Sequence, residues 1–363
     1  MSDITEHFDL SKNNTFKVSV KASYFTEVHT EDELLKVLSH TTHKDSPLLI
    51  LGEGANILFT KNFNGLIIKN SLLGRKIIEE TEKDVTLEIG AGENWHNFVM
   101  YSVVNRWSGI ENLALIPGTV GAAPVQNVAA YGQNFGEVVV SVSGYNLDTI
   151  NFELLTAKEC KFFYRDSVFK HDLKDKFFIT KVQIKLSKTP RFDTNYFGSK
   201  PYESLRSELE KINPNFPETP YTPQLVAEAV INQRKIKMPD WTVLGTAGSF
   251  FKNPFVSKQK YSELRATISQ LQAYPVDHML YPNPDDPIFQ MSDMVKIPAG
   301  RLLDELGWKG KRIGNVGTFE RHALVVVNYG GATGQEILEF TQKMQEDIKK
   351  NFAIELEPEV NIL

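Results

Sequence analysis

An apolar run of strand length, residues 47–51, ends in the glycine turn GEGAN (52–56), and a second apolar triplet, 57–59, follows at once. Short apolar runs separated by glycines predict a strand, a tight turn and a second strand. The turn lacks the third glycine of the GxGxxG fingerprint and leads into a strand, whereas that fingerprint opens a helix. The sequence therefore excludes a Rossmann dinucleotide site here. It also has no Walker A motif.

Strand and helix signals alternate along the rest of the chain. Further strands are predicted around 66–68, 85–89, 138–142 and 178–186. Helices are predicted where a capping residue precedes an amphipathic stretch: from Thr30 to about residue 40, from Thr222 with Pro223 at its first position, and from Thr333 with Glu336. Residues 190–222 are rich in Pro, Asn and Ser and resemble a linker.

Composition narrows the class of protein. A chain of 363 residues suggests two or three domains. The single cysteine, Cys160, rules out an intramolecular disulfide, a cysteine-based zinc site and an iron–sulfur cluster, and no metal is expected. A net charge of -5 argues against a nucleic-acid binder. Without a signal peptide or a run of 18 apolar residues, a cytoplasmic protein with no membrane insertion is expected.

Two glycine-rich segments are candidates for ligand contact. Successive N–H groups of the GEGAN turn could cradle a pyrophosphate, although on these residues alone a plain tight turn is the favoured explanation of the glycines. Residues 116–132 combine glycine, proline and alanine with a few polar side chains, namely Gln126, Asn127 and Tyr131. Small residues let a backbone approach a flat ligand closely. A close-packed surface loop is the alternative.

Three shorter motifs carry reactive side chains. In YRDS, Arg165 lies between an aromatic residue and a carboxylate, which on its own is typical of a structural ion pair. In GSFFKNP, Ser249 has no GxSxG elbow around it, which argues against a hydrolase nucleophile, and a turn serine is the simple alternative. In LEPEV, Glu359 belongs to an acidic pair that would ordinarily be solvated.

Taken in order, these motifs closely resemble the UDP-N-acetylenolpyruvoylglucosamine reductase (MurB) family of flavoenzymes. The resemblance runs from residue 14 to the C-terminus, through LGEGAN, AGENWH, GIENLALIPGTVG, PVQNVAAYG, YRDSVFK, GSFFKNP, IPAGRLLDELGWKG and LEPEV. A long segment with Tyr281 between GSFFKNP and IPAG is similar to the family type that keeps a tyrosine-bearing loop over the substrate.

The resemblance implies an α+β fold with a two-subdomain FAD-binding region of the vanillyl-alcohol-oxidase kind and a C-terminal α+β substrate domain. The expected boundaries are 1–69, 70–220 and 221–363. It implies that the flavin contacts come from the turn and the loop: Gly52, Glu53, Gly54, Ala55, Asn56, Ile57, Pro117, Gly118, Gly121, Ala122, Gln126, Asn127 and Tyr131. It assigns Ser249 as general acid with Arg165 and Glu359 beside it, and as substrate contacts Lys237, Asn253, Tyr196, Tyr202, Tyr281, Lys309 and His322.

This chain departs from the family pattern in places. Two tyrosines, Tyr196 and Tyr202, compete for one family position, and His322 stands where the family has a late polar contact. Ala122 and Ala123 occupy a place where serine is common, which removes a hydrogen bond to flavin.

The implied reaction is NADPH-dependent reduction of UDP-N-acetylenolpyruvoylglucosamine to UDP-N-acetylmuramate through FAD. It belongs to peptidoglycan precursor synthesis, and hence to cell-wall biogenesis, cell shape, the cell cycle and cell division. Partners are the UDP-sugar and NADPH. Two alternatives stay open: another flavin-dependent oxidoreductase of the same fold, such as an oxidase, and a non-catalytic UDP-sugar-binding protein.

Overall fold

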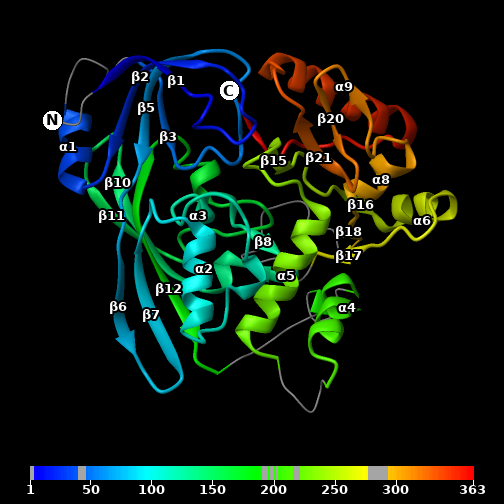
Figure 1. The fold of residues 1–363 in the computed structure, drawn as a ribbon, viewed down its shortest axis with the longest axis horizontal. Helices are drawn as coiled ribbons and strands as arrows, with labels where there is room; N and C mark the ends of the chain where they lie inside the picture. Colours follow the sequence, from blue (N-terminus) through cyan, green and yellow to red (C-terminus); the bar gives the residue numbers. More distant parts are fainter. Residues whose placement is uncertain are drawn as a thin grey trace. The chain divides into compact units, whose positions relative to one another are not determined.

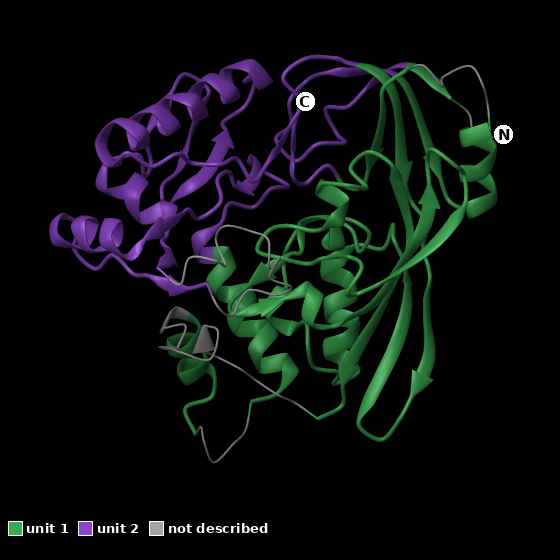
Figure 2. Ribbon diagram, turned by 180° about the vertical axis from the view of Figure 1, so that it is seen from behind, with its two compact units in different colours: residues 1–6, 24–53, 64–235 green, residues 7–23, 54–63, 236–363 purple. Residues whose placement is uncertain are grey.

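The structure is a computed structural model that describes residues 4–39, 46–189, 195–196, 200–201, 203–215, 221–276 and 293–363. The chain forms two compact units, shown in green and purple in Figure 2. Unit 1 comprises residues 1–6, 24–53 and 64–235, and unit 2 comprises residues 7–23, 54–63 and 236–363. Neither unit is one continuous segment. The domain boundaries expected after residues 69 and 220 stay a prediction.

The N-terminal part of the chain builds a four-stranded sheet in the order β1-β2-β5-β3 (Figure 1). Its strands are β1 (Thr5–Asp9), β2 (Lys21–Val28), β5 (Phe63–Asn70) and β3 (Leu48–Leu51), and β3 runs parallel to β5. Helix α1 (Glu31–Ser39) follows Thr30, whose hydroxyl accepts the amide N–H of Glu33 at 3.2 Å. The helix buries Leu34 and Val37, as its amphipathic pattern predicts.

Unit 1 also contains a five-stranded antiparallel sheet in the order β11-β10-β12-β7-β6. Its strands are β11 (Phe152–Thr156), β10 (Val139–Asn146), β12 (Phe177–Ser187), β7 (Asp84–Gly90) and β6 (Arg75–Glu80). Beyond its buried first residues, β12 alternates buried with more exposed positions, as its sequence predicts.

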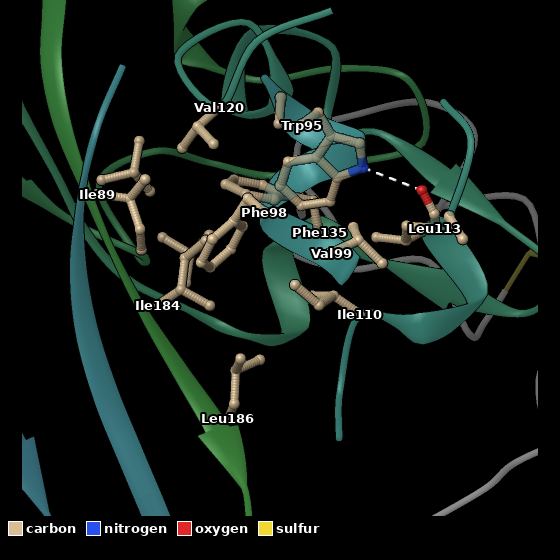
Figure 3. Close-up of a cluster of buried hydrophobic side chains, with 14 of the residues drawn as sticks. Ile89, Trp95, Phe98, Val99, Ile110, Leu113, Val120, Phe135, Ile184 and Leu186 are labelled. Carbon is tan, nitrogen blue, oxygen red and sulfur yellow. Dashed lines mark hydrogen bonds between the residues drawn. The ribbon is translucent and has the colours of Figure 1, made fainter. Parts of the chain in front are cut away.

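Helices α2 (Trp95–Val104) and α5 (Pro223–Lys237) share the main core of unit 1 with this sheet (Figure 1). Figure 3 shows the part of this core in which Trp95, Phe98 and Val99 of α2 face Ile89 and Ile184 of the sheet. The indole N–H of Trp95 donates to the carbonyl of Leu113 at 3.0 Å, so the largest buried side chain also has its polar atom satisfied. The predicted cap of α5 is present, since the hydroxyl of Thr222 accepts the amide N–H of Leu225 at 3.2 Å. The helices thereby fix the segments around them on a rigid core.

The segment interpreted as a linker contains regular structure. Helix α4 (Glu203–Ile212) lies within residues 190–222, and its Leu205 and Leu209 are fully buried in the core of unit 1. The spacing of these two leucines places them on one helix face. Shorter elements of the chain up to residue 201 are the 3-10 helices 111–113, 135–137 and 168–170, α3 (Ala123–Gln126), β8 (Ala129–Ala130), β9 (Gln133–Asn134), β13 (Asn195–Tyr196) and β14 (Lys200–Pro201).

Unit 2 contains a four-stranded antiparallel sheet in the order β15-β21-β20-β19. The strands are β15 (Gly245–Ser249), β21 (His322–Asn328), β20 (Val316–Phe319) and β19 (Arg312–Ile313). Helix α9 (Gly334–Phe352) has the predicted capping box of Thr333 and Glu336. It buries Ile337, Phe340, Met344 and Ile348 on one face.

Two smaller sheets complete the described part of unit 2. Strands β16 (Phe255–Ser257), β18 (Met294–Lys296) and β17 (Tyr274–Pro275) form one, and β22 (Asn361–Ile362) pairs in parallel with β4 (Ile57–Leu58) in the other. The remaining helices are α6 (Lys258–Thr267) and α8 (Ala299–Glu305). Among the described residues, no helix is long and apolar enough to cross a membrane.

Candidate functional site

The first half of the GEGAN turn is tied to a distant loop of unit 1. The Glu53 carboxylate accepts the N–H of Gly118 at 3.0 Å and the side-chain amide of Asn94 at 2.6 Å. A Cβ on Gly52 would lie 2.8 Å from the hydroxyl oxygen of Thr119, so this glycine permits a close approach. Glu53, expected to bind the cofactor, thus contacts the loop with one carboxylate oxygen and the N-cap residue of helix α2 with the other.

The second half of the turn is tied to the C-terminal segment of unit 2. Gly54 has φ +67°, and a Cβ there would lie 2.1 Å from the carbonyl oxygen of Asn13, so only glycine fits. The side-chain amide of Asn56 donates to the carbonyl of Glu359 at 3.1 Å, and the Asn56 carbonyl accepts the N–H of Asn361 at 3.0 Å. The other two predicted residues of the turn, Ala55 and Ile57, are half-buried.

The expected flavin-lining loop follows an edge formed by residues 91–95. Backbone hydrogen bonds of 2.8–2.9 Å join Gly118, Val120 and Gly121 to that segment. A Cβ on Gly121 would lie 2.6 Å from the Cβ of Ala91, so the two backbones need glycine to pack this closely. These contacts fix one side of the loop against residues 91–95. Two further residues of the loop were expected to contact the flavin: Pro117 is half-buried and Ala122 is exposed.

Gln126 has a buried polar atom that the described protein leaves unsatisfied. Its side-chain oxygen accepts from the ammonium of Lys170 at 3.3 Å, whereas its buried Nε2 has no hydrogen-bond partner among the described residues. An orphaned buried donor is costly and usually indicates a missing ligand or water. This donor fits a flavin, whose ring system carries carbonyl and ring-nitrogen acceptors. Gln126 is thus the predicted cofactor residue with a side-chain donor still available.

Asn127 and Tyr131, also expected at the flavin, are held by structural hydrogen bonds. The side-chain nitrogen of Asn127 donates to the carbonyl of Phe163 at 2.8 Å, and its side-chain oxygen accepts the N–H of Gly136 at 2.9 Å. The backbone carbonyl of Tyr131 accepts from the side chain of Asn112 at 2.8 Å. Asn127 therefore shapes the loop and fastens it to the turn that carries Arg165.

Arg165 stands at the tip of a tight turn and has φ +55°, an uncommon conformation for a residue with a side chain. Its guanidinium donates to the carbonyl of Ala129 at 3.0 Å, and the ammonium of Lys170 donates to the Arg165 carbonyl at 3.2 Å. The neighbouring Asp166 carboxylate lies 2.7 Å from the His171 imidazole. These contacts hold the arginine-bearing turn against the expected flavin-lining loop of unit 1.

Unit 2 brings Ser249 and Glu359 together through backbone pairing. The ladder between β15 and β21 shifts register between Thr246 and Ser249, and Gly248 has φ +78° there. Such a bulge redirects the side chain that follows it. The next residue after Ser249, Phe250, accepts the N–H of Glu359 at 2.7 Å through its carbonyl. Both predicted side chains belong to half-buried residues.

Three predicted substrate contacts form an electropositive group in unit 2. Burial, followed by the charges of Lys237 and Lys309, lowers the pKa of His322 to about 4, so this imidazole is neutral near pH 7. Burial also lowers the pKa of Lys237. Lys309 lies 3.5 Å from the Asp304 carboxylate. Two ammonium groups and a neutral imidazole in one region suit a ligand with negative charge.

The other predicted substrate contacts are less informative. The side-chain oxygen of Asn253 accepts the N–H of Ala299 at 3.0 Å and so caps helix α8. Tyr196 lies in the short strand β13. Tyr202 and Tyr281 lie outside the described residues.

The motif-based reasoning missed three residues that hold the predicted ones in place. Lys170 contacts both Gln126 and the Arg165 carbonyl, and Asn94 contacts Glu53. His96 accepts a backbone N–H immediately before the expected flavin-lining loop. All three belong to motifs that the sequence analysis quoted, YRDSVFK and AGENWH. Their side chains act on backbone distant in sequence, which no local pattern reveals.

Comparisons with known proteins show the family of the chain. A family profile described as UDP-N-acetylenolpyruvoylglucosamine reductase, C-terminal domain, matches residues 239–363, and an FAD binding domain profile matches residues 22–146. A Flavobacterium johnsoniae protein named UDP-N-acetylenolpyruvoylglucosamine reductase is 39% identical over 99% of this chain and all of its own length. A Chromobacterium violaceum protein of the same name is also 39% identical, over 98% of this chain and 97% of its own.

Solved structures agree on the fold. The chain is similar to UDP-N-acetylenolpyruvylglucosamine reductase from Thermus caldophilus, with a TM-score of 0.64 and 22% identity over 100% of this chain and 98% of the other. A solvent-stable cholesterol oxidase shares the fold with a TM-score of 0.50 and 10% identity over 99% and 87% of the two chains. The expected α+β class with an FAD-binding region of the vanillyl-alcohol-oxidase kind is confirmed. The chain belongs to the UDP-N-acetylenolpyruvoylglucosamine reductase family.

Proposed function

We propose that this protein reduces UDP-N-acetylenolpyruvoylglucosamine to UDP-N-acetylmuramate with NADPH as electron donor and FAD as carrier. The turn at residues 52–57 and the loop that carries Gln126 would hold FAD, which would supply hydride transfer from NADPH to the terminal carbon of the enolpyruvoyl double bond. The observation that carries the proposal is the half-buried Ser249 at a strand bulge beside the Glu359 segment, in a chain of this family.

The proposed role of Ser249 follows from the proton balance of the reaction. Addition of hydride to the terminal carbon leaves an electron pair on the α-carbon, which must then take up one proton. A carbanion-like centre is basic enough to accept that proton from a hydroxyl, and a serine hydroxyl is protonated at every physiological pH. The Ser249 Oγ–H bond breaks, and the alkoxide recovers its proton from solvent. Glu359, beside it, would orient the water that returns this proton.

The proposed role of Arg165 follows from charge. Negative charge that develops on the α-carbon is delocalised onto the adjoining carboxylate. A planar guanidinium binds a carboxylate through two parallel, charge-assisted hydrogen bonds. A charge already fixed in position requires no reorganisation during the reaction and is worth several kcal/mol in a site shielded from water. The strained turn and the Lys170 contact support such fixation of Arg165.

The electropositive group of unit 2 supports a role in substrate binding. Lys237 and Lys309 would attract the diphosphate of a UDP-sugar, and neutral His322 would offer a hydrogen bond without adding charge. In unit 1, Gln126 would donate its buried Nε2–H to the flavin. We place the reaction in peptidoglycan precursor synthesis, with consequences for cell shape and division. A cytoplasmic location follows from where NADPH and UDP-sugars are made.

The proposal is tested by measuring the two half-reactions separately under anaerobic conditions. The purified protein should be yellow, and acid precipitation should release all of its flavin. NADPH should bleach the flavin absorbance, and the enolpyruvoyl substrate should restore it. An oxidase would be restored by oxygen and not by this substrate, and a non-catalytic UDP-sugar-binding protein would be colourless.

Substitution of the serine sharpens this test. Ser249→Ala should leave bleaching by NADPH unchanged and slow the return of absorbance by about 10²–10⁴-fold, the usual contribution of a positioned acid. Ser249→Cys should recover part of the second phase, because a thiol can also donate a proton. Ser262→Ala is the matched control, since that exposed hydroxyl donates within helix α6. A parent rate of reoxidation in Ser249→Ala would show that the proton comes from another group.

A further inference from the structure

Leu115 is held in an uncommon conformation immediately before the expected flavin-lining loop. Its φ is +58°, a left-handed value that costs a residue with a side chain about 1–2 kcal/mol. Its N–H donates to Nδ1 of His96 at 3.0 Å, and its carbonyl accepts from Nε of Arg234 at 3.1 Å. Side chains of α2 and α5 thus form hydrogen bonds with both the backbone N–H and the carbonyl of Leu115.

Leu115 lies immediately before the loop, so its backbone conformation sets the direction in which the chain enters the loop. Pro117 follows two residues later and restricts Ile116, and Gly118 is already fixed by Glu53 and by the backbone of Trp95. Leu115 is therefore the position at which side-chain contacts set the direction of the chain as it enters the loop. A return of Leu115 to an ordinary negative φ would redirect the chain that enters the loop.

We infer that His96 is a positioning residue for FAD, acting through Leu115 on the loop 116–121. The inference rests on the proposed function, which places FAD against this loop. His96 itself needs no contact with the flavin. Its contribution is to keep the loop in the binding conformation before the cofactor arrives, so that binding does not have to supply the ordering.

The chemistry of the contact requires a neutral imidazole. Nδ1 can accept the Leu115 N–H only while it carries no proton, so the proton of the neutral ring lies on Nε2. Burial, and then the charges of Arg234 and Lys235 on α5, lower the pKa of His96 and favour this neutral form. Protonation would place two N–H donors face to face.

The experiment compares two substitutions at His96 by titration of the apoprotein with FAD at pH 7.5. His96→Leu removes the acceptor and should raise the Kd for FAD about tenfold, the equivalent of one hydrogen bond. His96→Asn keeps an acceptor, because its Oδ1 is bonded to Cγ as Nδ1 is, and should restore most of the affinity. Equal affinities of the parent and His96→Leu would overturn the inference, as would an asparagine variant no better than the leucine variant.

A matched control separates this effect from general loosening of the helices. The side chain of Gln224 on α5 donates to the carbonyl of Val103 on α2 at 2.6 Å. This hydrogen bond joins the same two helices but does not involve Leu115. Gln224→Leu removes one α5–α2 hydrogen bond and should leave the Kd for FAD unchanged. A rise equal to that of His96→Leu would show that only helix packing matters, and would overturn the inference.

The pH profile gives a second readout that does not depend on the folding of the leucine variant. In the parent, affinity for FAD should be constant above about pH 6.5, the ordinary pKa of histidine, and fall as the pH drops through the lowered pKa. In His96→Asn this fall should be absent or much reduced. A parent-like fall in His96→Asn would overturn the inference. A parent protein that binds no FAD would instead overturn the proposed function.

Discussion

The Arg165 turn of unit 1 and the Ser249 strand of unit 2 hold their reactive side chains in different ways. Around Arg165, side chains of Lys170, Asn127 and Ser167 bond to backbone carbonyls. Around Ser249, most of the support comes from backbone pairing with β21 and with the segment before β22, and the Thr246 hydroxyl adds two hydrogen bonds at the bulge. Side-chain support can be removed by one substitution, whereas a backbone ladder survives most of them. The comparison therefore predicts that neighbours of Arg165 are more sensitive to substitution than neighbours of Ser249.

The largest effect is expected from the arginine itself. Arg165→Lys keeps the charge but loses the planar pair of donors, and steady-state turnover should fall by about 10²–10³-fold, as when one fixed donor to a developing anion is removed. Arg206→Lys serves as the control, because Arg206 forms an exposed pair with Glu210 on helix α4. Near-normal turnover of Arg165→Lys would mean that Arg165 has only a structural role.

A smaller effect is expected from the support of that arginine. Lys170→Met removes the hydrogen bonds to Gln126 and to the Arg165 carbonyl, and turnover should fall about tenfold, the equivalent of one hydrogen bond. We expect kcat to fall while the melting temperature changes little. Lys161→Met removes an exposed ion pair with Asp172 nearby and should change neither. If Lys170→Met and Lys161→Met lost the same stability and the same turnover, the contacts of Lys170 would have no specific role in supporting Arg165.

The smallest effect is expected on the strand side. Gly248→Ala has room, since the nearest atom would lie 3.7 Å away, but it must adopt φ +78° and should lose about 1–2 kcal/mol of stability. Turnover should fall only a few-fold, because the ladder still presents Ser249. Gly330→Ala has φ +111° and open space, and should lose stability without losing turnover. Chemical denaturation and kinetics of both variants measure this difference. A larger loss of turnover in Gly248→Ala than in Lys170→Met would reverse the comparison.

Local features of the fold were predictable because local patterns determine them. The caps of α1, α5 and α9 and the alternation in β12 depend on residues a few positions apart. Helix α4 was missed because proline and asparagine on both sides masked a helix whose burial depends on contacts with a distant core. The sequence correctly marked the turn as glycine-dependent. The close approach of Asn13 to Gly54 gives that glycine a packing reason which the pyrophosphate hypothesis had not included.

For the candidate site, the sequence supplies candidate residues but not the contacts that hold them. Family motifs led to Ser249, Arg165 and Glu359, and their roles stay predictions. Sequence reasoning treated Glu53 as a cofactor ligand, but its carboxylate holds Gly118, which lies 65 residues away. Likewise Asn253 caps α8, a helix that begins 46 residues later. Contacts at this separation depend on the folded chain and have no signature within a motif.

The discontinuity of unit 2 has a consequence for how the protein is made. Residues 7–23 and 54–63 emerge early from the ribosome, but their partners come last: Thr15 bonds Thr246, Phe16 bonds Asn328, and β4 pairs with β22. This unit cannot close until translation has reached the end of β22, so residues 7–23 and 54–63 stay without these partners while roughly four-fifths of the chain is synthesised. Chaperone dependence should therefore be higher for this unit, and expressed fragments cut near residue 220 should leave its early strands without partners.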